Sequence, residues 1–540
     1  MDLLTFEQLW QRSVAAHGDR TFLLFRDRQR TDTEWTYAEF DRLVTAAAAW
    51  LEELGASRER PVHLCVGNCP AFVLLWLAAS RIGTWIVPVD PTSGARELQH
   101  QAERTSPAVT FIAAEHADAA AALSNPVVAL EQTADDLRHG GPLVPEHGGE
   151  PGARQAPAPL ERLAVMFTSG TTSQPKGVVL TQANYGYTGR TMAEFSGLRP
   201  HHRWLVTLPL FHANAQFYCF ASAIATGASV ALTSSFSASG WVDDASALRA
   251  THASLFAAPI RMILSKQADR PATAEGLQLS LTHVWFAQNL SHAHYEAFAR
   301  LCGVLPRQLY GMTETTAVVA CQPPGREGPD SIGPVIPGRR IRIHRLAETD
   351  AAGAEARPES AEALAAATRS DEDRPGLLQV YGRRGVELFR EYLDAPEVTR
   401  RAFASSAGEE AHDDDLPEVL FTTGDLVTSD ASGVLRFAGR SDDIIKVAGE
   451  NISLAEVEAV LAEAPGVLEV AVVSEADPIR DAVPVAHVVA QDPAHPPLEA
   501  ELMQYAAQHL PKAARPHRWK WLEALPRTSV GKIRRHALRQ

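Results

Sequence analysis

Residues 1–110 alternate amphipathic helical patterns with short apolar runs, and this alternation restricts the chain to an α/β layered fold. Helical patterns such as "FEQLWQRSVAAHG" and "AFVLLWLAASRIG" are separated by runs such as "PVHLCVGNCP" and "TWIVPVDP". Residues 160–309 repeat the alternation, with strand candidates "LAVMFTS", "RWLVTLPLF", "ASVALTSS", "ASLFAAPI" and "LTHVWFAQ". We therefore expect both stretches to form layered α/β subdomains.

The chain has 540 residues, which is beyond the size at which one hydrophobic core keeps growing. Residues 114–159 are rich in Ala, Gly and Pro and predict a weakly packed connection, whereas residues 345–376 predict a mobile insertion. A β-rich piece with "GLLQVYG" and "VLRFAGR" follows, and "SLAE" at Ser453 then indicates a capped helix start. The prediction is an N-terminal domain of layered α/β subdomains plus a β-rich piece, residues 1–440, and a small mobile α+β C-terminal domain, residues 441–540.

The charge and the apolar runs argue against several classes of protein. A formal charge of -15 disfavours binding to nucleic acid or to an anionic membrane surface. The most apolar run, "AFVLLWLAAS", is too short to cross a bilayer, which takes roughly 20 residues, so we expect a buried helix and no membrane span. Five cysteines and no signal-peptide pattern favour a reducing, cytoplasmic location, with Cys65 and Cys69 as buried thiols.

The stretch "MFTSGTTSQPKG", residues 166–177, is a candidate phosphate loop. Apolar runs enter and leave it, so it predicts a strand-to-strand connection. A Walker loop is excluded because Lys176 precedes Gly177, and because Pro175 lies where a helix would have to continue. Its hydroxyls, glycines and lysine suit phosphate, yet a solvated Ser/Thr turn fits the same residues equally well.

Four further stretches follow in order, namely "YGMTETT", "FTTGDL", "GRSDDIIKVAGENIS" and "PRTSVGKIRR". Together with the first loop they resemble the signature set of the adenylate-forming acyl-CoA synthetase superfamily. Three stretches are most similar to fatty-acid and crotonobetaine/carnitine-type CoA ligases, namely the first loop, "PLFHANAQ" and "VGKIRRHALR". The resemblance extends from the first strands to the last ten residues.

The resemblance implies ATP and Mg²⁺ as cofactors and a first step in which a carboxylate attacks the α-phosphate of ATP. These two anions must be neutralised and aligned. Glu314 would hold Mg²⁺, Asp425 the ribose hydroxyls, and Lys532 the charge that develops at the α-phosphate. Thr171 and His212 are the other candidate catalytic residues. The remaining candidate nucleotide-binding residues are Thr168, Ser169, Gly170, Thr172, Lys176, Tyr310, Gly311, Thr313 and Arg440.

The resemblance also implies a second step in which the thiol of coenzyme A attacks the adenylate and AMP leaves. No G-x-S-x-G nucleophile elbow is present, as expected for a reaction without an enzyme nucleophile. Family members reorient the small domain between the steps. Asp442 would then be the hinge, and Lys446 and Gly449 would border the thiol channel, where the backbone of a glycine lets pantetheine pass closely.

The acid pocket departs from the family pattern. The segment usually rich in glycine reads "FAQNLS" here, so we expect Phe286, Ala287 and Gln288 to add volume beside the acid, unless these side chains turn into the core. "LPLFHANAQFY" is the expected other wall, where the amides of Asn214 and Gln216 either contact substrate or satisfy backbone groups. His212 and Met312 complete the predicted pocket. An α-amino acid is disfavoured, because the Asp that pairs with its ammonium group is missing.

The leading hypothesis is an ATP-dependent acid–CoA ligase acting on a short, medium or aromatic carboxylic acid. One alternative keeps adenylate formation but changes the acceptor to an amine or a carrier-protein thiol, or the acid to nitrite for N–N bond formation. A regulator that binds nucleotide without catalysis is a third reading, disfavoured by Glu314, Asp425 and Lys532. The sequence leaves open whether the chain is a monomer or a homodimer.

Overall fold

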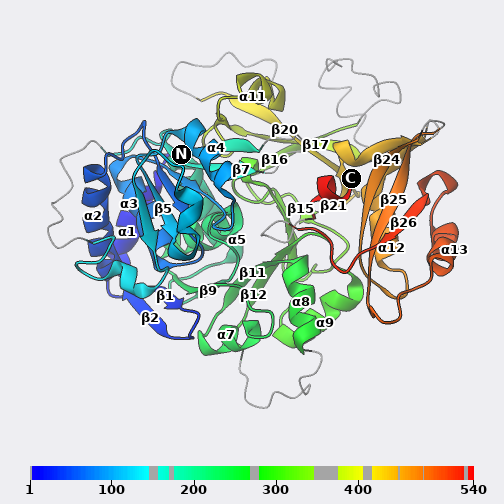
Figure 1. The fold of residues 1–540 in the computed structure, drawn as a ribbon, viewed down its shortest axis with the longest axis horizontal. Helices are drawn as coiled ribbons and strands as arrows, with labels where there is room; N and C mark the ends of the chain where they lie inside the picture. The colour runs from blue at the N-terminus through cyan, green and yellow to red at the C-terminus, as the bar shows by residue number, and fades with distance from the viewer. Residues whose placement is uncertain are drawn as a thin grey trace.

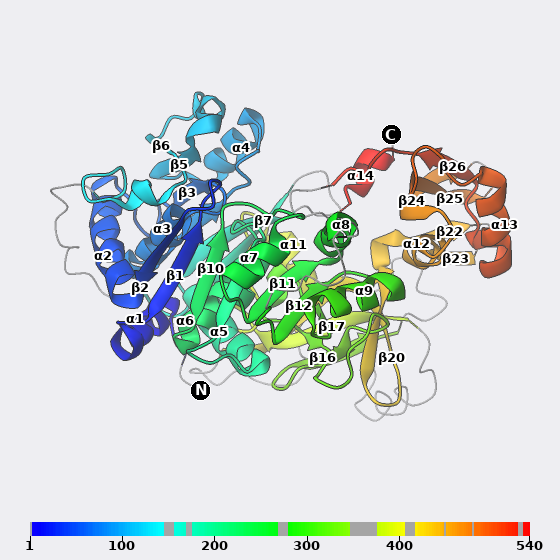
Figure 2. The same ribbon diagram turned by 90° about the horizontal axis from the view of Figure 1, so that it is seen from below.

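The computed structural model describes residues 3–144, 156–168, 175–267, 279–345, 375–405, 416–447, 450–477, 480–527 and 533–539. The expected insertion falls almost wholly between these ranges. The predicted site residues Ser169, Gly170, Thr171, Thr172, Gly449 and Lys532 also lie outside the described residues. Figures 1 and 2 show a large body formed by the elements up to β21, with a smaller body that holds the C-terminal elements beside it.

One mixed sheet of the large body has the strand order β14-β13-β12-β11-β9-β10-β1-β2. Its strands from β13 to β1 pair in parallel, and the edge strands β2 and β14 pair antiparallel. Parallel pairing needs crossover connections, which the alternation of helical and apolar patterns supplies. The strands are β1 (Thr21–Arg26), β2 (Asp32–Thr36), β9 (Arg203–Val206), β10 (Ser229–Thr233), β11 (His252–Phe256), β12 (His283–Ala287), β13 (Arg307–Tyr310) and β14 (Ala320–Cys321).

A second mixed sheet has the order β18-β8-β7-β4-β3-β5-β6. The strands β7 and β8 form the antiparallel pair on either side of the candidate phosphate loop, as the sequence predicts. The strands are β3 (Val62–Cys65), β4 (Ile86–Pro88), β5 (Val109–Ala113), β6 (Val127–Leu130), β7 (Arg162–Thr168), β8 (Lys176–Thr181) and β18 (Glu391–Tyr392).

Helices cover both sheets, and one of them is buried on all sides. Every residue of α3 (Pro70–Ile82) except Arg81 is buried, which confirms the buried helix expected from its apolar run. On the first sheet, side chains of successive strand residues enter two different cores, one under α1, α5 and α6 and one under α7, α8 and α9. The helices are α1 (Phe6–His17), α2 (Tyr37–Glu53), α4 (Ala95–Thr105), α5 (Gln182–Ser196), α6 (Ala221–Thr226), α7 (Trp241–Ala247), α8 (Ala257–Gln267) and α9 (His292–Cys302).

The expected β-rich piece is a third sheet with the order β15-β21-β20-β17-β16, to which β19 adds beside β20. Its strands pair antiparallel. The elements are β15 (Gly333–Pro334), β16 (Arg340–His344), β17 (Gly376–Arg383), α11 (Pro396–Ala402), β19 (Phe403–Ser405), β20 (Glu418–Ser429) and β21 (Val434–Arg440).

The small C-terminal body has its own sheet, β23-β22-β25-β24, with β26 beside β25, and its own core. The Ser453 side chain accepts a hydrogen bond from the Glu456 backbone at the start of α12, so the predicted helix cap is confirmed. The elements are β22 (Ile444–Val447), β23 (Glu450–Ser453), α12 (Leu454–Ala462), β24 (Val467–Asp477), β25 (Asp481–Ala490), α13 (Glu499–His509), β26 (Arg518–Trp521) and α14 (Arg535–Leu538). The predicted combination of a large α/β domain with a small α+β domain is confirmed.

Two expectations about local structure are wrong in part. The segment 114–159 is not merely a surface connection, because β6 extends the second sheet and Leu137, Leu143 and Val144 are buried in its core. Short apolar runs in this Ala- and Pro-rich stretch supply enough buried surface. The strand expected over "ASLFAAPI" ends at Phe256, and α8 begins at the next residue.

Candidate active site

Lys176 lies near the C-terminal end of the candidate phosphate loop, residues 166–177. It begins β8 and pairs with Thr168 at the end of β7, whose hydroxyl donates to the Lys176 carbonyl at 3.5 Å. The ammonium of Lys176 lies 5.2 Å from the centre of the Tyr392 ring, which is within the range of a cation–π contact. The residues that flank the loop therefore place a positive charge over an aromatic ring.

Glu314 contacts the hydroxyl group of the same tyrosine. It belongs to the 3-10 turn η4 (Thr313–Thr315) and is 6% exposed, and its Oε1 accepts a hydrogen bond from the Tyr392 hydroxyl at 3.1 Å. Burial and the Glu314 charge both raise the pKa of Tyr392, so its hydroxyl remains a proton donor. The structure thus joins Lys176, Tyr392 and Glu314 into one group, although they are far apart in the sequence.

Asp425 forms a second group with Tyr310 and Arg440. The Tyr310 hydroxyl donates to Oδ2 of Asp425 at 2.5 Å, and Nε of Arg440 lies 3.6 Å from Oδ1. Arg440 faces Asp425 across the β20–β21 ladder, so the strand register fixes this pair. A carboxylate oxygen can accept more than one hydrogen bond, so a carboxylate in this position is chemically suited to accept from hydroxyl donors.

The predicted pocket wall, residues 208–218, runs into a π-helix, η3 (Asn214–Phe220). The Tyr218 hydroxyl lies against Gly311, where an added Cβ would come within 2.7 Å of it. Gly311 therefore suits this close approach, and η3 borders the turn that carries Glu314. A π-helix has more than four residues per turn, so Asn214 and Tyr218 lie on nearly the same face. In the described part of the chain no group hydrogen-bonds Asn214 Oδ1, and the residue is 7% exposed.

The expectation that Phe286 lines the acid pocket is wrong. Phe286 is fully buried in the core under α7, α8 and α9, where its ring lies 6.1 Å from that of Tyr295. Because side chains alternate along a strand, its neighbour Trp285 enters the opposite core. Ala287 packs at the edge of that opposite core and is partly exposed, as are Gln288 and the predicted pocket residue Met312.

Gln216 does not belong to the pocket. Its amide donates to the Leu210 carbonyl at 2.7 Å and accepts from the Tyr185 hydroxyl at 2.6 Å, so it holds the wall in shape. His212 is half-buried, with its ring 4.6 Å from that of Phe211 at the start of the same segment.

Two residues near the site were missed by the sequence analysis. Tyr392 belongs to none of the five motifs. It comes close to Glu314 because β18 pairs with β8. Arg339 is buried and donates to the Thr315 and Ala317 carbonyls, and at 2.9 Å to the Glu387 carbonyl. It holds the chain around the turn of Glu314. A Pro-Gly turn before this arginine was the available signal, but it does not reveal burial.

The C-terminal site residues are described in part. The backbone of Asp442 lies in a 3-10 turn, η5 (Ser441–Asp443), between the two bodies, and the backbone of Lys446 lies in β22. On either side of residues 528–532, Arg527 and Ile533 form an antiparallel bridge.

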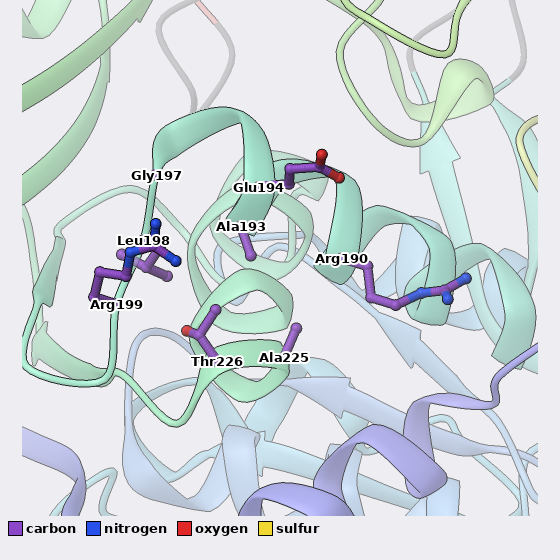
Figure 3. Close-up of a pocket in the computed structure, with 8 residues that line it drawn as sticks. All are labelled: Arg190, Ala193, Glu194, Gly197, Leu198, Arg199, Ala225 and Thr226. Atoms are coloured by element: carbon purple, nitrogen blue, oxygen red, sulfur yellow. The ribbon is translucent and has the colours of Figure 1, made fainter.

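A cavity of about 310 Å³ lies at the end of α5 and is lined in part by Arg190, Glu194 and Arg199 (Figure 3). None of the predicted site residues lines it.

In the described ranges, no group of three or more His, Cys, Asp or Glu side chains is arranged to hold a metal ion. The five cysteines are buried and unpaired, as expected for Cys65 and Cys69. No described helix is both long and apolar enough to span a membrane.

The fold and the family matches define an adenylate-forming enzyme. Residues 10–357 match the family described as AMP-binding enzyme, and residues 456–532 match the AMP-binding enzyme C-terminal domain. The chain therefore belongs to the AMP-binding enzyme family. This confirms the resemblance to adenylate-forming acyl-CoA synthetases that the five motifs predicted.

Several known proteins are similar over nearly the full length. The crotonobetaine/carnitine–CoA ligase of Salmonella typhi is 27% identical, with 97% of each chain covered. The ATP-bound crystal structure of MatB from Rhodopseudomonas palustris superposes with a TM-score of 0.81 at 22% identity, covering 99% of this chain and 98% of that one. The anthranilate CoA ligase AuaEII in complex with anthranoyl-AMP superposes with a TM-score of 0.80 at 20% identity, covering 100% of this chain and 97% of that one.

Proposed function

We propose that this chain is an ATP-dependent carboxylic acid–CoA ligase, which forms an acyl adenylate with release of pyrophosphate and passes the acyl group to the thiol of coenzyme A. The observation that carries the proposal is that Tyr392 donates a hydrogen bond to Glu314 while its ring lies under the Lys176 ammonium. It brings a cation and a carboxylate to the same tyrosine at the end of the candidate phosphate loop. The full-length similarity to a CoA ligase supports the choice of acceptor.

Glu314 fits a role in holding Mg²⁺ although it is a single carboxylate. Mg²⁺ is usually bound through one or two carboxylates together with substrate phosphates and waters. The Tyr392 hydroxyl orients the Glu314 carboxylate by donating a hydrogen bond to Oε1. When bound, the ion would neutralise charge on the phosphates.

The remaining roles follow from charge and position. Lys176 and the hydroxyls of residues 168–173 would bind the departing pyrophosphate, and Asp425 would accept the ribose hydroxyls while Arg440 balances its charge. The Tyr310 ring would contact adenine, and Lys532 would stabilise charge as the carboxylate meets the α-phosphate. Reorientation about Asp442 would then bring Lys446 and Gly449 to the thiol.

The acid is proposed to carry a hydrogen-bond donor, such as a hydroxyl or amino group. The buried Oδ1 of Asn214 is an acceptor that no described group satisfies, on the same face of η3 as Tyr218. A buried unpaired acceptor costs about 1–3 kcal/mol, so a donor on the substrate would recover part of that energy. One of the similar structures is an anthranilate CoA ligase, which acts on an acid with an amino group.

The test is incubation of the purified protein with ATP, Mg²⁺, coenzyme A and a panel of aliphatic, hydroxylated and aromatic acids. The expected products are AMP, pyrophosphate and an acyl-CoA thioester in equal amounts. If pyrophosphate is released with some acid but no thioester forms, the acceptor is wrong. If nitrite or an amine replaces the acid or the thiol in that assay, the corresponding alternative is correct.

A further inference from the structure

The turn after Glu314 contains a threonine in a backbone conformation that threonine rarely adopts. Thr316 has a φ of 60° and a ψ of -91°, which lies outside the small left-handed region that non-glycine residues occasionally enter. A positive φ crowds the Cβ of a β-branched residue against its own backbone, so this conformation is strained. Thr316 is fully buried, and strain of this kind persists only where surrounding contacts hold the backbone in place.

The guanidinium of Arg339 supplies these contacts. Its Nη2 donates to the carbonyls of Thr315 and Ala317, which lie on either side of the strained residue. Its Nη1 donates at 2.9 Å to the Glu387 carbonyl, which also accepts a hydrogen bond from the Thr316 hydroxyl at 2.9 Å. One planar cation therefore joins both sides of the turn to the segment that precedes β18.

Burial makes these contacts of Arg339 strong. The residue is 6% exposed, and its guanidinium lies 5.2 Å from the centre of the Tyr187 ring. Burial lowers its pKa, and three nearby residues raise it, namely Tyr187, Glu387 and Tyr218. Water does not replace a hydrogen bond lost in such a place, so the three carbonyls depend on this side chain.

The same turn determines where the Glu314 carboxylate lies. The Thr316 N–H donates to the Thr313 carbonyl at 3.2 Å and closes η4, and the Phe389 N–H donates to the Glu314 carbonyl at 2.9 Å. Beyond the strained residue the chain returns, and β14 pairs with β13. A change of backbone angles at Thr316 would therefore move Glu314 relative to the Tyr392 hydroxyl.

We infer that Arg339 is a positioning residue, which holds the strained turn at Thr316 closed and so keeps the Glu314 carboxylate in place for Mg²⁺. The inference rests on the proposed function, in which Glu314 holds that ion. Mg²⁺ demands near-ideal octahedral geometry, so a displaced carboxylate binds it less well. Loss of Arg339 is therefore expected to weaken the response of the protein to Mg²⁺.

The first test compares Arg339→Met, which keeps an apolar stem and removes the donors, with the wild type. Calorimetry gives the ratio of the ATP dissociation constants in EDTA and in Mg²⁺, and this ratio is expected to be at least fivefold smaller in the variant. The Mg²⁺ concentration for half-maximal acid-dependent pyrophosphate exchange is expected to rise at least fivefold.

The matched control for this test is Arg340→Met. Arg340 is the exposed neighbour of Arg339 and pairs with Glu418, so both quantities are expected to keep their wild-type values. If Arg339→Met does not fold, Arg339→Lys takes its place. A single ammonium cannot serve the carbonyls that the arginine holds from two nitrogens, so the same two changes are expected.

The second test isolates the strain and needs no activity. Thr316→Gly and Thr316→Ala both remove the hydroxyl, but only alanine keeps a Cβ at a positive φ. Thr316→Gly is therefore expected to unfold at a higher urea concentration than Thr316→Ala, although glycine ordinarily loses more chain entropy on folding. In the Arg339→Met background, the glycine is expected to recover at least half of the lost response to Mg²⁺ and the alanine none.

The inference is overturned if folded Arg339→Met or Arg339→Lys responds to Mg²⁺ as the wild type does. It is also overturned if Thr316→Gly unfolds at no higher urea concentration than Thr316→Ala, or if both restore the response to Mg²⁺ equally. If no acid supports exchange in the wild type, the proposed function is wrong, and the calorimetry and the unfolding curves still decide this inference.

Discussion

The hydroxyl of Tyr392 donates to the Glu314 carboxylate at 3.1 Å while the Lys176 ammonium lies 5.2 Å from the centre of the same ring. One aromatic side chain thus connects a cation of β8 with an anion of η4. Tyr392 reaches this position because β18 extends the sheet beside β8, with Tyr392 paired to Val178. The phenol therefore sets the distance between the two charges that the proposed reaction requires.

The substitution Tyr392→Phe separates the two contacts, since it keeps the ring under Lys176 and removes the hydrogen bond to Glu314. A hydrogen bond to a charged group contributes about 1.5–3 kcal/mol, so acid-dependent pyrophosphate exchange is expected to fall about 10- to 100-fold. The Mg²⁺ concentration for half-maximal rate should rise. Tyr381→Phe on β17 makes the same chemical change away from this group and serves as control. A wild-type rate and Mg²⁺ dependence in Tyr392→Phe would contradict the role of Tyr392.

Asp425→Asn tests the nucleotide group. The change removes the negative charge beside Arg440 and weakens acceptance of hydroxyl donors. We expect the KM for ATP to rise at least tenfold, with a parallel loss of ATP affinity in calorimetry. Asp430→Asn, in the turn that joins β20 and β21, is the control. Unchanged ATP affinity in Asp425→Asn would remove Asp425 from the site.

Asn214→Leu tests the proposed class of acid. The wild type is expected to prefer an acid with a hydroxyl or amino donor over its unsubstituted counterpart by about 10- to 100-fold in kcat/KM. The unsubstituted acid would leave the buried Asn214 Oδ1 without a hydrogen-bond donor. The leucine variant should lose that preference while it still accepts the unsubstituted acid. The ratio of the two acids within each variant corrects for differences in folding. A preference that survives the substitution would place the donor contact elsewhere.

Two buried histidines predict loss of stability in acid. Burial lowers the pKa of His63 to about 3 and that of His252 to about 3, whereas the unfolded chain titrates near 6.5. Below pH 6.5 the unfolded state therefore binds protons that the folded state excludes, so the free energy of unfolding falls as pH drops from 6.5 towards 3. Each histidine contributes a slope of about 1.4 kcal/mol per pH unit in that window.

His252→Asn should reduce this slope in urea unfolding curves recorded between pH 4 and 7. Equal slopes in wild type and His252→Asn would show that His252 is not held neutral in the folded protein.

The sequence predicted those parts of the molecule that depend on local pattern. The strands on either side of the phosphate loop and the cap at Ser453 are where the pattern places them, because turn chemistry and helix capping act over a few residues. Phe286 was misplaced because the sequence of a strand buried on both faces does not reveal which side chains face which core.

Contacts between distant segments could not be predicted. Tyr392 meets Glu314 across 78 positions and Arg261 meets Glu469 across 208, and single residues of these types occur on many surfaces. The boundary between residues 440 and 441 and the roles of the site residues remain predictions.

The central claim is that this chain forms an acyl adenylate, and acid-dependent exchange of labelled pyrophosphate into ATP tests it most directly. The wild type is expected to catalyse exchange with at least one acid of the panel, and Lys532→Ala is expected to reduce that exchange by at least 100-fold while it still binds ATP. Exchange with no acid in a folded, ATP-binding protein, or equal exchange in wild type and Lys532→Ala, would contradict the account.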